Sequence, residues 1–189
     1  DIYHQVEDAL LASTAGEDDV RVRRAALEAL GYSSRPEVAT LIESAFQRQD
    51  PNWQTSALIA MGRSADDRWL DEVMLSLVHV DDRIRKAAVQ AAGELSLQPA
   101  RPILLKMLSE EEDAGVLSAV IWSLSQIGGE DVRTYLVNLL DQLEDEEQIE
   151  FLEEALDNLA FTEDLDRFDL LSYDPDEELT EIDGENDDK

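Results

Sequence analysis

The chain has 189 residues, of which 43% are hydrophobic and 6% aromatic, so it can bury a core and is not disordered throughout. Its formal net charge of −30 argues against binding to nucleic acid or to an anionic membrane, because phosphate groups are bound by clustered Lys and Arg. The absence of Cys excludes disulfides and thiolate metal sites.

The acidic residues are unevenly distributed. Residues 1–109 contain 17 acidic and 12 basic residues, whereas residues 110–189 contain 28 acidic and 3 basic ones. This asymmetry is compatible with a basic protein partner, and also with acidic residues that only keep the protein soluble. No apolar run approaches the roughly 20 residues that cross a bilayer, and no secretory signal is visible in a chain that begins at Asp1. We therefore expect a cytoplasmic protein.

The chain opens on an apolar-periodic segment, residues 2–12, which we interpret as the second helix of a repeat whose first helix is missing. Three similar segments follow at intervals of 31 residues: DVRVRRAALEALG (19–31), DPNWQTSALIAMG (50–62) and DDRIRKAAVQAAG (81–93). The leading Asp suits a helix N-cap, and the final Gly suits a left-handed residue that closes the helix. Val22, Trp53 and Ile84 share one column, at the start of a predicted buried stripe.

Each of these segments is followed by a second predicted helix, at 35–46, 66–78 and 98–108. A fourth repeat follows an insertion that includes EEED (110–113). Its first helix is predicted to end at Gly128 and its second to span 131–143. A fifth repeat, EEQIEFLEEALDNLA, has lost the glycine. Two helices per period without strand patterns predict an all-α fold, an α-solenoid of antiparallel helix pairs.

The segments 19–31 and 81–93 resemble the short HEAT-like repeat first named from phycobilin lyases, and the resemblance covers about residues 1–160. It implies a HEAT-like solenoid but no particular function, because this repeat occurs in many unrelated proteins. We expect the solenoid to occupy residues 1–172, with 161–173 as a final capping helix. Residues 173–189 are expected to form an acidic, disordered tail.

No catalytic constellation is visible. Neither His4 nor His79 is followed by Glu, as a di-iron hydroxylase of the HEAT-like class requires, and the charge has the wrong sign for a HEAT-like DNA glycosylase. The tail segment 174–188 does not fit the calcium loop of an EF-hand, which leaves low-affinity cation binding as its alternative. We expect no enzyme activity, no cofactor and no metal site.

The fourth repeat departs from the others. Counted back from Gly128, Val120 and Ile121 fall in columns that are mostly polar elsewhere, and Trp122 falls in a column of small residues. This predicts an exposed apolar patch that binds a protein partner. The alternative is a register slip after the insertion, which would turn these residues inward against the fifth repeat.

A second candidate lies on the second helix of the second repeat, where Leu75 and Val78 lie off the core stripe. The resemblance implies that second helices line a concave face, where residues in related columns would join them: Thr40, Asp71, Lys106 and Asp141. An apolar spot in a polar groove predicts an anchor for a peptide or helix. The alternative is a helix that its neighbours cover on both sides.

The sequence therefore predicts a non-catalytic scaffold or adaptor that binds a protein, and the charge permits a basic one. We expect no nucleic acid and no membrane as partner. Two other functions stay open: an accessory or chaperone-like subunit of a modifying enzyme such as a lyase, and an acidic mimic of nucleic acid that binds a basic protein.

Overall fold

The computed structural model describes residues 2–16 and 19–167, which form ten α-helices and two short 3-10 helices without a β-strand. The helices alternate between two layers. The first-helix layer consists of α2 (Val20–Leu30), α4 (Pro51–Arg63), α6 (Asp82–Glu94), α8 (Ala114–Ile127) and α10 (Glu146–Arg167). The second-helix layer consists of α1 (Ile2–Ala15), α3 (Pro36–Phe46), η1 (Asp67–Trp69) with α5 (Leu70–Ser76), η2 (Gln98–Ala100) with α7 (Arg101–Glu110), and α9 (Glu130–Leu140).

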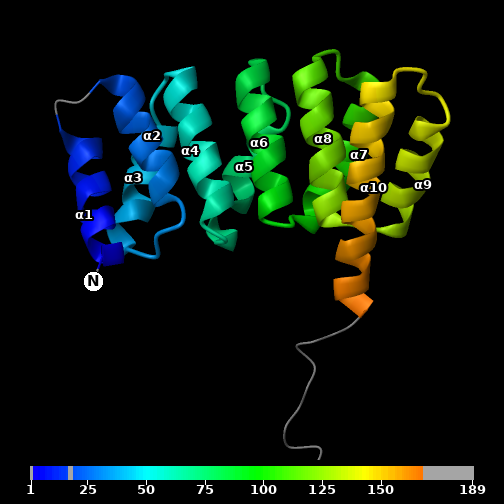
Figure 1. Cartoon of the computed structure of the whole chain (residues 1–189). Coiled ribbons are helices and arrows are strands. Elements are labelled where there is room, and N and C mark those ends of the chain that lie inside the picture. Colours follow the sequence, from blue (N-terminus) through cyan, green and yellow to red (C-terminus); the bar gives the residue numbers. More distant parts are fainter. Residues whose placement is uncertain (1, 17–18, 168–189) are drawn as a thin grey trace, which may run out of the picture.

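The array is held together by contacts between neighbouring repeats. Figure 1 shows α2, α4, α6 and α8 side by side in one row, with α5 and α7 behind them. Consecutive first helices pack directly against one another, and α1 packs against α2. The buried apolar side chains form one continuous core from Leu27 in α2 to Leu159 in α10. The predicted all-α solenoid of helix pairs is therefore confirmed. Such an array is stable because each helix pair leaves apolar surface that the next pair covers.

Aspartates begin the first helices, as predicted. The Asp19 and Asp81 carboxylates accept hydrogen bonds from backbone N–H groups of the first turn, at 2.8 Å and 3.0 Å, and Asp50 caps α4 in the same way. Asp113 caps α8 by accepting from the N–H of Val116 at 2.9 Å. These bonds satisfy N–H groups that the start of a helix leaves unpaired. They also lower the pKa of Asp19 and Asp50 below the usual aspartate value.

The repeated glycines are not left-handed, which corrects the sequence prediction, although Gly31 is the C-cap of α2. Gly31 has a right-handed φ of −53°, and Gly62 and Gly93 lie inside α4 and α6. Their role is close packing between first helices. A Cβ atom on Gly62 would lie 2.9 Å from the Cα atom of Ala91, and one on Gly93 would lie 2.8 Å from the Cα atom of Ser123. Neither position has room for a side chain.

In the second and third repeats, the left-handed residue lies three positions after the repeated glycine. Ala65 and Ser96 each have φ of 50°, and Gly128 has φ of 76°. Gly128 therefore corresponds to Ser96 and not to Gly93. The N-caps agree, because Asp113 follows Asp81 by 32 residues, as Gly128 follows Ser96. The fourth repeat is shifted by three residues from the alignment that its glycine indicates.

Two further expectations are wrong. Val22, predicted to be buried like Trp53 and Ile84, is 51% exposed. Residues 161–167 do not begin a separate capping helix, because they continue α10, and both Phe161 and Leu165 are exposed. The boundary predicted at residue 172 and the acidic tail lie outside the described residues.

Candidate protein-binding surface

The shifted register decides where the apolar residues of the fourth repeat lie. Val120 is fully buried and Ile121 is 7% exposed, because they correspond to Ala88 and Val89 in the core columns of α6. The prediction that both belong to an exposed patch is wrong. The alternative is confirmed for these two residues: α8 turns their side chains inward, and α7 and α10 pack against this helix.

Trp122 behaves differently from its two neighbours. It is 39% exposed and corresponds to Gln90 of α6, which is exposed, and to Ile59 of α4, which is half-buried. Of the three residues predicted as a patch, the structure leaves only Trp122 at the surface. Tryptophan combines a large apolar area with few rotatable bonds, and it is enriched among residues that dominate protein interfaces.

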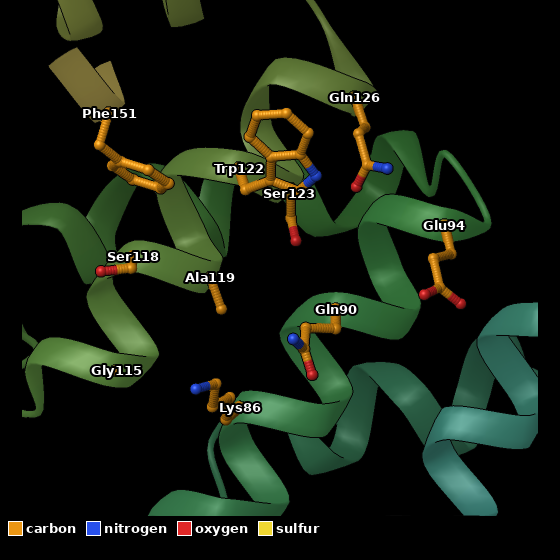
Figure 2. A pocket seen from close by; sticks show the side chains of 10 residues that line it. All are labelled: Lys86, Gln90, Glu94, Gly115, Ser118, Ala119, Trp122, Ser123, Gln126 and Phe151. Atoms are coloured by element: carbon orange, nitrogen blue, oxygen red, sulfur yellow. The ribbon is translucent and has the colours of Figure 1, made fainter. Parts of the chain in front are cut away.

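Trp122 borders a hollow of about 320 Å³ on the first-helix layer, which we call the α6–α8 hollow. Its lining residues come from three helices: Lys86, Gln90 and Glu94 of α6, Gly115, Ser118, Ala119, Trp122, Ser123 and Gln126 of α8, and Phe151 of α10. Figure 2 shows Trp122 and Phe151 on one side of the hollow and Lys86 and Gln90 on the other. The small residues of α8 leave the space between these walls open.

The α6–α8 hollow is nearly balanced in charge. Lys86 and Glu94 are the two charged residues of its lining. Partial desolvation raises the pKa of the Glu94 carboxyl group, an effect that the nearby charge of Arg63 opposes. The amides of Gln90 and Gln126 add hydrogen-bonding groups beside the two aromatic rings. Such a mixture of aromatic and polar groups can hold a protein segment in one orientation.

A second hollow lies on the other side of α8, and we call it the α8–α10 hollow. It has a volume of about 510 Å³ and lies between α8, the end of α9 and the start of α10. Its lining residues are Ala114, Leu117, Ser118, Ile121, Leu139, Leu143, Asp145, Glu147, Gln148, Phe151 and Leu152. Ser118 and Phe151 border both hollows, so the two form one continuous surface across the fourth repeat.

The residues predicted on the second helices are exposed but border neither hollow. Leu75 is 73% exposed and Val78 is 69% exposed, so the alternative in which neighbouring helices cover them is wrong. The residues in related columns are exposed as well: Thr40, Asp71, Lys106 and Asp141. Lys106 forms an exposed ion pair with Glu110 at 3.3 Å. A binding groove along this layer stays a prediction.

The described part of the chain offers no arrangement for metal chemistry or for crossing a membrane. No group of three or more His, Asp or Glu within residues 2–16 and 19–167 could hold a metal ion. No helix in the same ranges is long and apolar enough to span a bilayer. The two histidines have local partners: His4 lies 3.0 Å from the Glu7 carboxylate, and the Nδ1 atom of His79 accepts a hydrogen bond from the backbone N–H of Asp81.

A family model described as HEAT repeats matches residues 7–91 and 70–157. The two matches together cover more than half of the chain and most of the helical array. The chain is a HEAT-repeat protein. No curated protein gives a significant match to the sequence. HEAT repeats form extended surfaces that commonly bind other proteins, but membership in the family assigns no partner to this HEAT-repeat protein.

Sequence reasoning missed Lys86, Gln90 and Phe151 as parts of the surface. An alignment on Gly128 places Trp122 opposite Ala87 of the third repeat, which is the wrong column. The N-cap at Asp113 carried the correct signal, since an alignment on the capping aspartates places Trp122 opposite Gln90. Phe151 could not be found in this way, because it reaches the hollow from the next repeat.

Proposed function

We propose that this HEAT-repeat protein is a non-catalytic scaffold or adaptor that binds a protein partner over the α6–α8 hollow. The observation that carries the proposal is the exposed Trp122 beside an open hollow, in a column where the third repeat has Gln90. The exposed part of the Trp122 ring is apolar surface in contact with water. A partner that covers this surface therefore gains binding free energy.

The surroundings of Trp122 support a protein rather than a small molecule as the ligand. The hollow is open, and it continues past Ser118 and Phe151 into the α8–α10 hollow. A helix or extended segment can lie across both, with side chains entering each in turn. Lys86, Glu94 and the two glutamines then provide polar contacts at the edge, as in the polar rim of other protein interfaces.

The experiment compares two aromatic substitutions. Trp122→Gln gives the fourth repeat the residue that the third repeat has at this position, so the fold should be retained. Tyr135→Gln removes a different exposed aromatic side chain, on α9 of the second-helix layer. The unmodified chain and both variants are used for affinity purification from the native organism, after circular dichroism has shown equal helicity.

A protein retained by the unmodified chain and by Tyr135→Gln, but lost with Trp122→Gln, is the expected result. Equal retention by all three chains contradicts a role for the α6–α8 hollow. A scaffold also predicts that no bound protein is chemically modified by the purified chain. A partner whose modification depends on this protein together with an enzyme would instead favour the accessory-subunit alternative.

A further inference from the structure

The α8–α10 hollow has an apolar floor. Leu117, Leu139 and Leu143 are half-buried, and Phe151 and Leu152 complete the apolar lining from α10. Phe151 is half-buried as well, so part of this lining remains accessible from solvent. A partner that places an apolar side chain here removes more of this surface from water.

Leu117 is an unusual residue for its column. The equivalent residues of the first three repeats are Arg23, Gln54 and Arg85, all of them polar. In the third repeat, Arg85 forms a two-point ion pair with Glu111, with both N–O distances at 2.9 Å. The fourth repeat gives up this polar position and presents a leucine to a hollow. The change therefore adds accessible apolar surface where the other repeats place hydrogen-bonding groups.

The rim of the same hollow is acidic. Asp145 and Glu147 line it and are exposed, and Glu144, Glu146 and Glu150 lie beside them in the sequence. The sequence contains no Lys, Arg or His from residue 134 to residue 166. Among the described residues, no basic side chain forms an ion pair with Asp145 or Glu147. The α6–α8 hollow differs, because Lys86 lines it.

These charges restrict what can cover the floor. A group that approaches Leu117 also removes water from the carboxylates of Asp145 and Glu147, which is unfavourable unless positive charges pair with them. A second copy of this chain carries the same net charge of −30, and the chain's own residues 168–189 are predominantly acidic. Neither complements the rim. A segment with both apolar and basic side chains complements floor and rim together.

We infer that the α8–α10 hollow is the docking site for a basic amphipathic segment of the partner protein. A large apolar side chain of that segment lies against Leu117 and Phe151, and its Lys or Arg side chains lie beside Asp145 and Glu147. This inference rests on the proposed function, since it names the chemistry of the partner that the scaffold binds.

The test uses a defined peptide and the full chain. The probe is a fluorescein-labelled peptide of Lys and Leu, with Leu at helical spacings of three and four residues. A second peptide keeps every Lys and replaces every Leu with Ser. Binding of both is measured by fluorescence anisotropy at physiological salt, where charge attraction alone is partly screened. The expected result is that the Lys/Leu peptide binds at least about tenfold more tightly than the Lys/Ser peptide.

Two substitutions then locate the site. Leu117→Gln introduces the residue that the second repeat has in this column, and it should weaken binding of the Lys/Leu peptide by about tenfold while leaving the Lys/Ser peptide unchanged. Glu147→Lys should weaken binding of the Lys/Leu peptide more than Glu153→Lys does. Glu153 is an exposed residue of the same helix that does not line the hollow, so this control changes the net charge equally.

Equal binding of the two peptides, or equal binding to the unmodified chain and to Leu117→Gln, overturns the inference. If Leu117→Gln loses its helicity, the comparison of Glu147→Lys with Glu153→Lys decides alone, and equal effects overturn the inference. The proposed function is rejected by a different result from the one that rejects this docking site. A natural partner that depends on Trp122, together with a peptide that ignores Leu117, leaves the scaffold proposal intact and rejects only this docking site.

Discussion

Gly93 of α6 lies against Ser123 of α8 so closely that a Cβ atom at position 93 would be 2.8 Å from both the Cα and the Cβ atoms of Ser123. Gly62 has the same relationship with Ala91 in the preceding pair of helices. The recurring glycine thus sets the spacing of the first-helix layer. The surface that we propose for partner binding depends on this spacing, because α6 and α8 line the same hollow.

The first prediction concerns this spacing. Gly93→Ala should lower the free energy of unfolding by about 1–3 kcal/mol, since the added methyl group has no space and the helices must separate. Gly115→Ala is the matched control within α8, where the nearest atoms are the ends of the Asp113 and Lys86 side chains, at 3.2 Å and 3.4 Å. It should change stability by less than about 0.5 kcal/mol. Urea denaturation of both variants measures the difference, and equal stability would contradict the close-packing role.

The second prediction concerns the register of the fourth repeat. Val120→Ala removes two methyl groups from a fully buried side chain and should cost about 1–2 kcal/mol of stability. Trp122→Gln should cost less than about 1 kcal/mol, because the side chain is partly exposed and Gln occupies the equivalent position of α6. Thermal and urea denaturation test the order. The glycine-based alignment predicts that Val120 is exposed and that its truncation has little effect.

The third prediction concerns the ion pair between Arg85 and Glu111. The pair joins the start of α6 to the loop before α8, and Arg85 also donates to the carbonyl oxygen of His79 at 2.9 Å. Glu111→Gln should cost about 1–2 kcal/mol at pH 7, because the partly buried charge of Arg85 loses its charged partner. The measurement is urea denaturation, with Glu110→Gln as a control at an exposed neighbour.

The same pair has a predicted pH dependence. The hydrogen bonds from Arg85 hold the pKa of Glu111 below its usual value of 4.5. The folded state therefore favours the ionised carboxylate, and its stabilising contribution is complete above pH 4.5 and is lost as the pH falls through the lowered pKa. The stability difference between the unmodified chain and Glu111→Gln should shrink at acidic pH. A difference that stays constant from pH 7 to about pH 3 would show that the pair does not act through this charge.

The fourth prediction concerns Leu75 and Val78 as an anchor for a partner on the second-helix layer. Replacing Leu75 and Val78 together with Ser should change the free energy of unfolding by no more than about 0.5 kcal/mol per site, because both side chains are exposed. If the pair anchors a partner, as the sequence predicts, retention of that partner in affinity purification should fall. Val80→Ser, at a neighbouring exposed valine, is the control. Unchanged retention in the double variant rejects the anchor.

Local sequence signals predicted most of the fold. The capping aspartates, the apolar spacing within each segment and the recurrence at 31 residues led to the helix pairs, and a match to HEAT repeats confirms the family. These signals succeed because helix starts and apolar faces are decided by residues within a few positions of one another. The resemblance to the short HEAT-like repeat added the expectation that the second helices line a concave face, which stays a prediction.

The candidate surface was predicted only in part. Trp122 was identified for the wrong reason. Val120 and Ile121 were misplaced because aligning Gly128 with Gly93, when it corresponds to Ser96, shifts every column of the fourth repeat by three residues. Leu75 and Val78 were correctly expected to lie off the core. Phe151 was not found, because its approach to α8 depends on how the last repeat packs.

By itself, the sequence determined that the chain forms paired helices in a row and that its second half is strongly acidic. Only the tertiary structure decided what the glycines do, which residue of the fourth repeat remains exposed, and where the surface is hollowed. The physical reason is distance along the chain. Gly93 and Ser123, or Phe151 and Trp122, are separated by about 30 residues, and their relation depends on how whole helices pack against each other.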